Sequence, residues 1–183
     1  KIDVLVGTQM LSKGHDYHNV KLAVVLGIDC LLNMNSYKAR EKALSLLIQI
    51  AGRSGRNGFG EVIIETKNEE FFKYYLEEAG YLDFLKNELE FRKDLYPPFL
   101  KLARVVLSSA NGLKIKEELT QIVSYLKTIE QIEVVGFGEC AVFKIANKYR
   151  YEILIRSKNS KSLLKALHSI KSAYISIDMD TIY

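Results

Sequence analysis

The sequence has little of what marks a secreted, membrane-spanning or metal-binding protein. It contains only two cysteines, Cys30 and Cys140, in 183 residues. They lie far apart and without a set of Cys or His partners, so both are expected to be buried thiols in a reducing cytoplasm. No apolar run approaches the roughly 20 residues of a membrane span, and the start shows no signal-peptide pattern. These absences favour a cytoplasmic protein without a membrane anchor, and no metal site is assigned.

A nucleotide-binding phosphate loop is also missing. Nowhere does the sequence contain Gly-x-x-x-x-Gly-Lys followed by Ser or Thr, the loop whose backbone amides cradle phosphates. The chain alone is therefore not expected to hydrolyse ATP. Because Lys1 leads at once into strand-like residues, we expect a fragment of a longer protein, long enough for one large or two small domains.

The most informative stretch present is a closely spaced pair of arginines. Residues 49–56 read Gln-Ile-Ala-Gly-Arg-Ser-Gly-Arg and follow residues 39–48, whose apolar spacing predicts a helix. A glycine directly before Arg53 and another before Arg56 leave the backbone free to turn out of the helix. Paired guanidinium groups suit a polyphosphate whose charge is neutralised during transfer. Taken alone, so short a motif is more often an exposed basic turn.

Polar residues also follow the predicted strand at residues 2–6. Ligands of open α/β sheets lie at the carboxyl ends of strands, which is where Thr8 and Gln9 are expected. Both side chains can bond a phosphate oxygen, and Lys13 adds positive charge. Further along the same loop, His15 and Asp16 could link it to the arginines. From the residues alone, the histidine would be a solvent-facing loop residue and the aspartate a turn or cap residue.

Both stretches resemble helicase motifs. Residues 49–56 resemble motif VI of superfamily 2 helicases, Gln-x-x-Gly-Arg-x-Gly-Arg, and residues 4–16 resemble motif V. The sequence Gly-Thr-Gln-Met, followed by Lys-Gly-His-Asp, is similar to that of the bacterial primosomal DNA helicases. The resemblance continues through Leu31-Leu32-Asn33 and Tyr96-Pro97-Pro98-Phe99, so that it covers nearly the whole chain.

The resemblance implies the C-terminal part of an ATP-dependent DNA helicase that restarts stalled replication forks and initiates primosome assembly. ATP with Mg²⁺ would be held mainly by a motor half outside this chain, and zinc by a cysteine-rich module that nothing here matches. Implied partners are single-stranded and branched DNA, other primosome proteins and single-stranded DNA-binding protein, with the enzyme a monomer. The implied roles are catalysis for Arg53, Arg56 and Gln49, nucleotide contact for Gly52, Arg53, Arg56 and Asp16, and a grip on DNA for Thr8, Gln9, Lys13 and His15.

Three regions are predicted, an α/β part followed by an α+β part. Residues 1–66 read as the end of a RecA-like helicase domain, in which 22–26 forms a central parallel strand covered on both faces. Residues 67–96 have a helical, acidic pattern interrupted at Gly80, and are expected to form a solvated helical connector. The Pro97-Pro98 pair then opens a C-terminal domain over 97–183.

The C-terminal domain shows the order β-α-β-β-α-β, which predicts a ferredoxin-like split βαβ fold. The family resemblance implies the same fold. Ser160 is the expected N-cap of the second helix. The predicted strands cover 102–109, 132–142, 149–156 and 174–179, and the predicted helices cover 113–129 and 160–171.

Basic residues gather in this last domain. Residues 144–171 contain eight lysines and arginines and a single acid, Glu152. Lys148, Tyr149 and Arg150 alternate charge with an aromatic ring, a pattern that can stack bases and neutralise phosphates. The alternative is a solvated face with core tyrosines. A rival for the whole chain is a non-catalytic nucleic-acid-binding protein of ribosomal type, and an RNA helicase fragment would instead prefer a 2′-hydroxyl.

Overall fold

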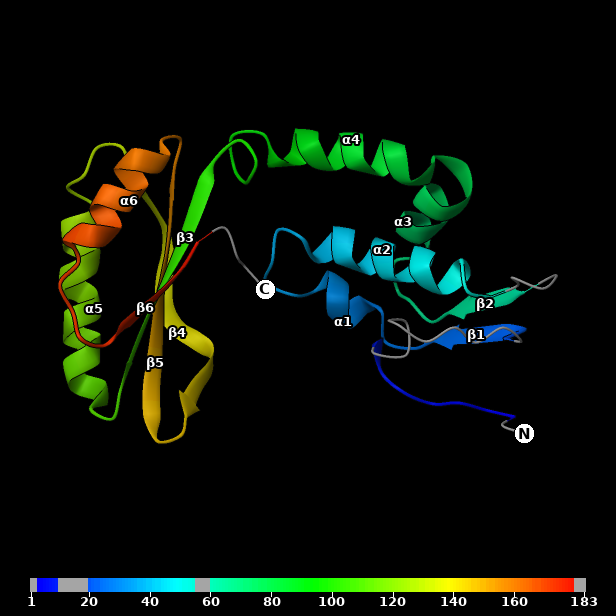
Figure 1. The fold of residues 1–183 in the computed structure, drawn as a ribbon, viewed down its shortest axis with the longest axis horizontal. Helices are drawn as coiled ribbons and strands as arrows, with labels where there is room; N and C mark the ends of the chain where they lie inside the picture. The colour runs from blue at the N-terminus through cyan, green and yellow to red at the C-terminus, as the bar shows by residue number, and fades with distance from the viewer. Residues whose placement is uncertain (1–2, 10–19, 55–59, 180–183) are drawn as a thin grey trace. The chain divides into compact units, whose positions relative to one another are not determined.

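The computed structural model describes residues 3–9, 20–54 and 60–179. The chain forms two compact units, Lys1–Glu90 and Phe91–Tyr183 (Figure 1). The unit boundary lies near the end of a helix, a few residues before the position that Pro97-Pro98 suggested. Within the described ranges, none of the helices is both long and apolar enough to cross a membrane.

The first unit has a small parallel sheet with helices packed beside it. Its two strands pair in parallel with Leu22 opposite Glu61 and Val25 opposite Ile64, which confirms the parallel strand predicted at 22–26. The elements in chain order are β1 (Leu22–Val25), α1 (Asp29–Leu32), α2 (Ala39–Ala51), β2 (Glu61–Ile64), α3 (Glu69–Lys73), the π-helix η2 (Tyr74–Glu78) and α4 (Gly80–Arg92).

Two strand predictions in this unit are wrong in part. Residues 3–6 form no strand, and Val4 and Val6 are 78% and 88% exposed. An extended apolar segment becomes a strand only where a neighbouring edge supplies hydrogen bonds, and none of the described strands pairs with it. β1 is a strand, but its residues alternate between exposed and half-buried, so it is not covered on both faces.

Helix α2 and the region after β2 together build the core of the first unit. Ala43, Leu44 and Leu47 of α2 pack with Phe72, Tyr75 and Phe84, all less than 9% exposed. The prediction of a solvated connector is therefore wrong, because its aromatic residues complete this core. The rings of Tyr75 and Phe84 meet edge to face with centroids 5.2 Å apart. Gly80 does separate two helical segments, with a φ of 73° that favours glycine.

The second unit is a four-stranded antiparallel sheet with two helices. The sheet order is β4-β5-β3-β6, and all three neighbouring pairs run antiparallel. With helices after the first and third strands, this is the split βαβ arrangement predicted from the sequence. The elements are β3 (Lys101–Ser109), α5 (Gly112–Leu126), β4 (Glu133–Ile145), β5 (Lys148–Ser157), α6 (Ser160–Ser169) and β6 (Ile175–Met179).

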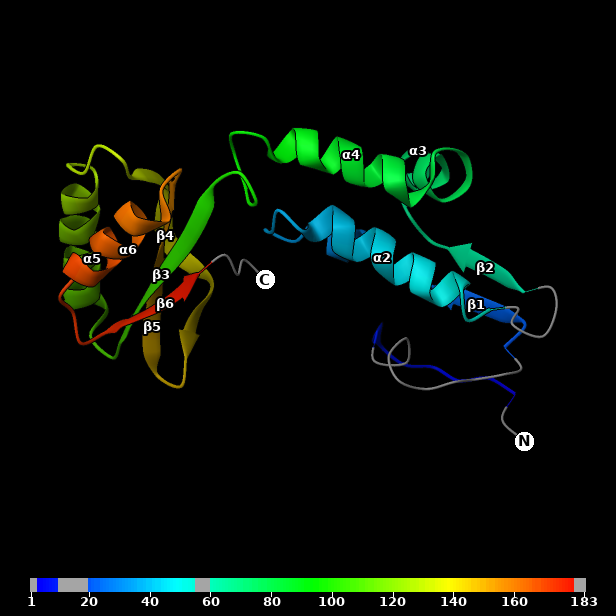
Figure 2. The same cartoon turned by 45° about the horizontal axis from the view of Figure 1, so that its top comes forward.

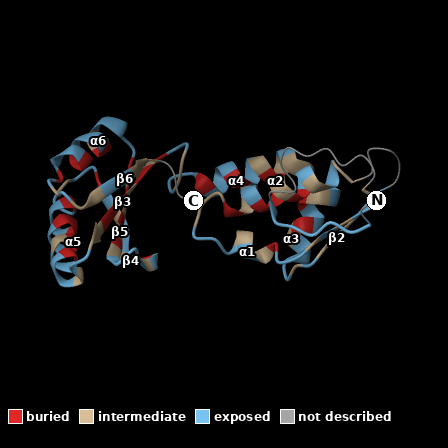
Figure 3. Ribbon diagram, turned by 60° about the horizontal axis from the view of Figure 1, so that its bottom comes forward, coloured by how far each residue is buried: buried red, intermediate tan, exposed pale blue. Residues whose placement is uncertain are grey.

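Both helices cover the same face of this sheet (Figures 1 and 2). Val105 of β3 and Ile153 of β5 are fully buried against Leu119 of α5 and Leu163 of α6. Figure 3 shows buried and exposed residues alternating along α5 and α6, as expected for helices with one face on a core. Ser160 is not the cap of α6. Asn159 caps it instead, because its side chain accepts from the backbone amides of Lys161 and Ser162.

The two cysteines differ. Cys140 is buried, as expected, and burial together with the nearby Glu152 charge raises the pKa of its thiol. The prediction for Cys30 is wrong, because this residue is exposed at the start of α1. Helix α1 is a single short turn with no buried residue, so nothing in it encloses the thiol.

Candidate nucleotide and nucleic-acid sites

The arginine motif begins at the exposed end of α2. Gln49 is exposed in the last turn, and the backbone amide of Gly52 donates to the carbonyl of Ile48 over 2.9 Å. Gly52 has a φ of −65°, so its helical conformation does not itself require glycine. Ser54 fastens this end to the sheet, because its hydroxyl donates to the carbonyl of Glu61 over 3.1 Å. The half-buried Arg53 thus lies near the amino end of β2.

A second polar cluster lies at the opposite, carboxyl edge of the same sheet. The Asp29 carboxylate, just after β1, accepts from the Thr66 hydroxyl over 2.7 Å, the Lys67 amide over 2.7 Å and the Asn68 side chain over 3.0 Å. The Lys67 amide, followed by the other two donors, lowers the pKa of this carboxyl. Asp29 therefore ties the segment after β1 to the segment after β2, and its oxygens are occupied by these bonds.

The remaining first-unit candidates are less constrained. Thr8 and Gln9 are exposed. Lys13, His15, Asp16 and Arg56 lie outside the described residues, so their grouping with the described motif residues stays a prediction.

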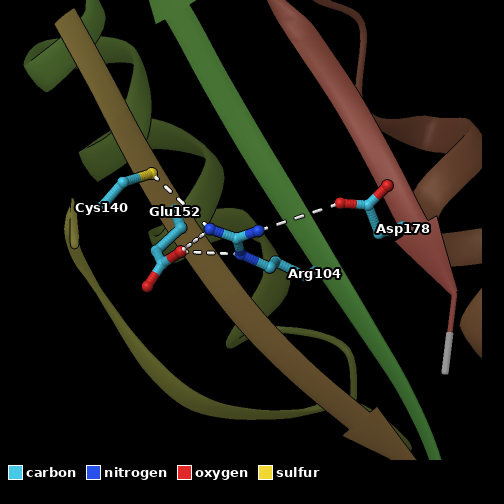
Figure 4. Close-up of polar contacts among 4 residues, drawn as sticks. All are labelled: Arg104, Cys140, Glu152 and Asp178. Carbon is cyan, nitrogen blue, oxygen red and sulfur yellow. Dashed lines mark hydrogen bonds and ion pairs between the residues drawn. The ribbon is translucent and has the colours of Figure 1, made fainter. Parts of the chain in front are cut away.

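In the second unit, the sheet face away from the helices is occupied by an ion cluster (Figure 4). Arg104 of β3 donates from Nε to Glu152 Oε2 over 2.7 Å, and a second guanidinium nitrogen contacts the same oxygen. Its Nη1 lies 4.0 Å from Asp178 of β6. The Arg104 side chain is only 11% exposed, and its charge is already paired with acids. The centre of this sheet face is therefore not suited to binding DNA.

Arg104 was missed by the sequence analysis, although a signal was present. It is the one charged residue between Leu102 and Leu107, inside an apolar strand. A charge in such a place needs a partner, because burial without one is costly. The partners Glu152 and Asp178 come from strands far away in sequence, so the pattern predicts that a partner exists but not which one.

The three residues predicted around Tyr149 do not form one surface. Residues 149, 151, 153 and 155 point to the helix side of β5, while Arg150 lies on the opposite face with Glu152. Tyr149 is half-buried. A Cβ added at Gly112 would lie 3.1 Å from its ring, and Lys144 Nζ lies 4.8 Å from the ring centre. The Tyr149 ring is thus enclosed, whereas Lys148 and Arg150 form no ion pair within the described part of the chain.

The eight basic residues of 144–171 therefore differ in availability. Arg156 is neutralised by Glu133, to which its Nε donates over 2.7 Å; this bond lowers the pKa of the glutamate and raises that of the arginine. Lys158 lies 3.8 Å from Asp94, and Lys144 lies over the Tyr149 ring. No acid among the described residues pairs with the remaining five, Lys148, Arg150, Lys161, Lys165 and Lys171.

Comparison with known proteins now gives these features a family. The family described as "Primosomal protein N C-terminal domain" matches residues 93–182. These residues, just under half of the chain, are thus similar to that family of C-terminal domains. Over its whole length it is similar to the replication restart protein PriA. It is 43% identical to PriA of Helicobacter pylori over 187 residues, which is 100% of this chain and 30% of the relative.

A more distant relative gives the same result. The chain is 32% identical to PriA of Bacillus subtilis over 195 residues, covering 98% of this chain and 24% of the relative. The chain thus spans less than a third of the length of either protein. Among solved structures, the de novo designed protein Foldit4 aligns with 46% of this chain at 12% identity and a TM-score of 0.38, a likeness too low to carry an argument.

Proposed function

We propose that this chain is the C-terminal part of an ATP-dependent superfamily 2 DNA helicase that restarts stalled replication forks and initiates primosome assembly. The observation that carries the proposal is the presence of both features in one chain. The Gln49 to Arg53 stretch forms the carboxyl end of α2, with Gln49 exposed and Arg53 half-buried, and residues 93–182 match a primosomal C-terminal domain. The names of the relatives, replication restart proteins, support the same cellular role.

In this proposal the first unit is the end of a RecA-like motor domain. Arg53 and Arg56 contact the γ-phosphate of ATP, which is bound with Mg²⁺ by another lobe, and Gln49 orients the attacking water or the phosphate. Gly52 and Asp16 complete the nucleotide contact. Thr8, Gln9, Lys13 and His15 grip DNA and couple that grip to hydrolysis. The guanidinium forks stabilise charge that develops on the transferring phosphoryl group.

The second unit is proposed to bind DNA through positive charge. Its lysines and arginines that pair with no acid among the described residues, Lys148 and Arg150 among them, suit the phosphates of single-stranded and branched DNA. The partners proposed for the whole protein are other primosome proteins and single-stranded DNA-binding protein, and its place of action is the cytoplasm. The rival of a ribosomal-type binding protein leaves the helicase-like motif at the end of α2 without a role.

The test of the motor assignment is ATP turnover by the full-length protein that carries this chain. An arginine finger is worth about 10³–10⁵ in rate, so Arg56→Ala should lower DNA-stimulated turnover far more than nucleotide affinity. Arg56→Lys should not rescue, because an ammonium group cannot present a planar fork. Near-normal turnover in the lysine variant would contradict the assignment and make Arg53 the better candidate.

The test of the DNA-binding assignment is the salt dependence of binding by the present chain. Lys148→Ala with Arg150→Ala should weaken binding to an oligonucleotide and reduce the salt slope by roughly 0.7–0.9 for each phosphate that is no longer neutralised. The chain alone should show no ATP turnover above background, with or without DNA, since it has no phosphate loop. Unchanged affinity and slope in the double variant would reduce that end of β5 to a solvated face.

A further inference from the structure

A shallow groove runs between the end of α5, the segment 129–131 that follows it, and one side of α6. It is open to solvent, has a volume of about 440 Å³ and is lined by Tyr125, Ile129, Glu130, Gln131, Ser162, Lys165, Ala166 and Ser169. The four α6 residues recur at helical spacing, so one stripe of α6 forms one wall. In Figure 2 the two helices lie side by side on the same side of the sheet.

Tyr125 gives this groove an open aromatic ring. It is 44% exposed, and its hydroxyl donates to Ser169 Oγ over 2.9 Å, which fixes the ring at the groove wall. Other tyrosines of this unit are covered: Lys144 lies over Tyr149, and Lys114 Nζ lies 5.0 Å from the Tyr174 ring centre. Among the described residues, no ring or cation lies over Tyr125. A base can therefore stack on it.

Lys165 gives the same groove a positive charge. It is exposed, lines the groove and has no ion pair among the described residues. One turn earlier, Lys161 is also exposed and lies on the same side of α6. Gln131 accepts a hydrogen bond from the Ser162 hydroxyl through Oε1, which leaves its amide N–H groups to donate. The groove thus combines a stacking ring with donors for a phosphate.

We propose that this groove binds one nucleotide of a single-stranded DNA, with the base on Tyr125 and the adjoining phosphate on Lys165 and Lys161. The inference rests on the proposed DNA binding of the second unit and assigns a place for it. The proposed base-stacking site is this groove and not the end of β5, where the Tyr149 ring is enclosed. Glu130 is the one acid among the residues that line the groove, and its negative charge would repel the phosphate.

Binding of a labelled short oligodeoxythymidylate to the 183-residue chain, measured by anisotropy across a salt series, tests the proposal. Tyr125→Ala should weaken binding about 5- to 150-fold, the value of one stacked base, whereas Tyr125→Phe should retain most of the affinity. Lys165→Ala should reduce the salt slope by roughly 0.7. Glu130→Gln should raise the affinity. The matched control is Lys116→Ala, an exposed α5 lysine outside the groove, which should leave affinity unchanged.

The outcomes separate this inference from the proposed function. If wild type binds the oligonucleotide and Tyr125→Ala binds equally well, the groove assignment is overturned while DNA binding stands. If wild type binds no DNA, the proposed function of the second unit fails. If Tyr125→Phe loses as much affinity as Tyr125→Ala, the residue acts through its bond to Ser169, and the stacking role is wrong. Melting curves establish that each variant is folded.

Discussion

The two units differ in how completely their sheets are covered. In the second unit, both helices lie on one sheet face and bury residues such as Val105 and Ile153 to 0% exposure. In the first unit, Leu22, Val24 and Ile63 line one face of the β1–β2 sheet and remain 50%, 54% and 54% exposed. Both units have apolar strands. An apolar sequence therefore shows that a strand can be buried, and not that it is buried. Only the second unit supplies that packing from its own described residues.

The strongest test of this difference is a cavity in the closed core. Ile153→Ala removes a fully buried side chain from the central strand β5 and should cost about 2–5 kcal/mol of unfolding free energy. Hydrogen exchange followed by mass spectrometry would report this on peptides from β3, β5 and α5. Peptides from α2 should keep their protection. Weaker protection in both units together would show that they unfold as one cooperative body.

The ion cluster of the second unit should matter less than its core. Arg104→Ala leaves Glu152 and Asp178 without their cation, and we expect the free energy of unfolding to fall by about 1–3 kcal/mol. The comparison variant is Arg156→Ala, whose partner Glu133 is 59% exposed; it should cost only about 0.2–1 kcal/mol. Urea unfolding measures both, and equal effects would mean that the cluster is no more than a surface pair.

In the first unit, the Asp29 bonds give a pH-dependent contribution. The three hydrogen bonds lower the pKa of this carboxyl below its ordinary value. A lowered pKa in the folded state stabilises the fold above the unfolded-state pKa, and this stabilisation disappears as the pH falls through the folded value. Asp29→Asn should therefore weaken protection of the β2 and 66–68 peptides at neutral pH, and the difference from wild type should vanish in acid.

The control for this pH effect is Glu78→Gln, an exposed acid of η2. It should show no comparable pH-dependent difference. If Asp29→Asn behaves like it at all pH values, the hydrogen bonds of Asp29 do not fasten the two segments after the strands.

The smallest effect is expected on the uncovered face. Val24→Thr keeps a β-branched residue on the exposed side of β1 and should change stability by no more than about 0.5 kcal/mol. The same substitution at Val105, which is 0% exposed, buries a hydroxyl and should cost about 1–3 kcal/mol. Thermal unfolding of the present chain compares them. A large destabilisation at Val24 would indicate that this face is covered in solution.

The sequence predicted the second unit well because its signals are local. Alternation along 149–156 and the helical spacing of 160–171 need no knowledge of distant residues. The sequence-based prediction failed where strand pairing or burial depends on contacts with residues that are distant in sequence. Residues 3–6 have strand-like composition but pair with none of the described strands. Phe72, Tyr75 and Phe84 lie in an acidic stretch whose apolar stripe packs on α2.

The candidate sites show the same limit. A helix end at the arginine motif could be predicted from spacing, and α2 does end at Ala51. The placement of Tyr149 and Arg150 on opposite faces follows from alternation alone. The enclosure of Tyr149 depends on Gly112 and Lys144, and the open ring of Tyr125 depends on the meeting of α5 and α6. Such interactions join elements that are distant in sequence.

The irregular edge strand β4 has a consequence for self-association. It is an edge strand of the sheet with exposed apolar side chains, including Val135, Phe137 and Val142, and a flat apolar edge strand would be a template for strand addition between copies. The register of β4 against β5 shifts between Val134 and Gly136 and again between Glu139 and Lys144. Such shifts bend and twist an edge so that a second copy cannot pair along its length. From these shifts we expect β4 to be a poor template for edge-to-edge pairing, even though its composition alone favours such pairing.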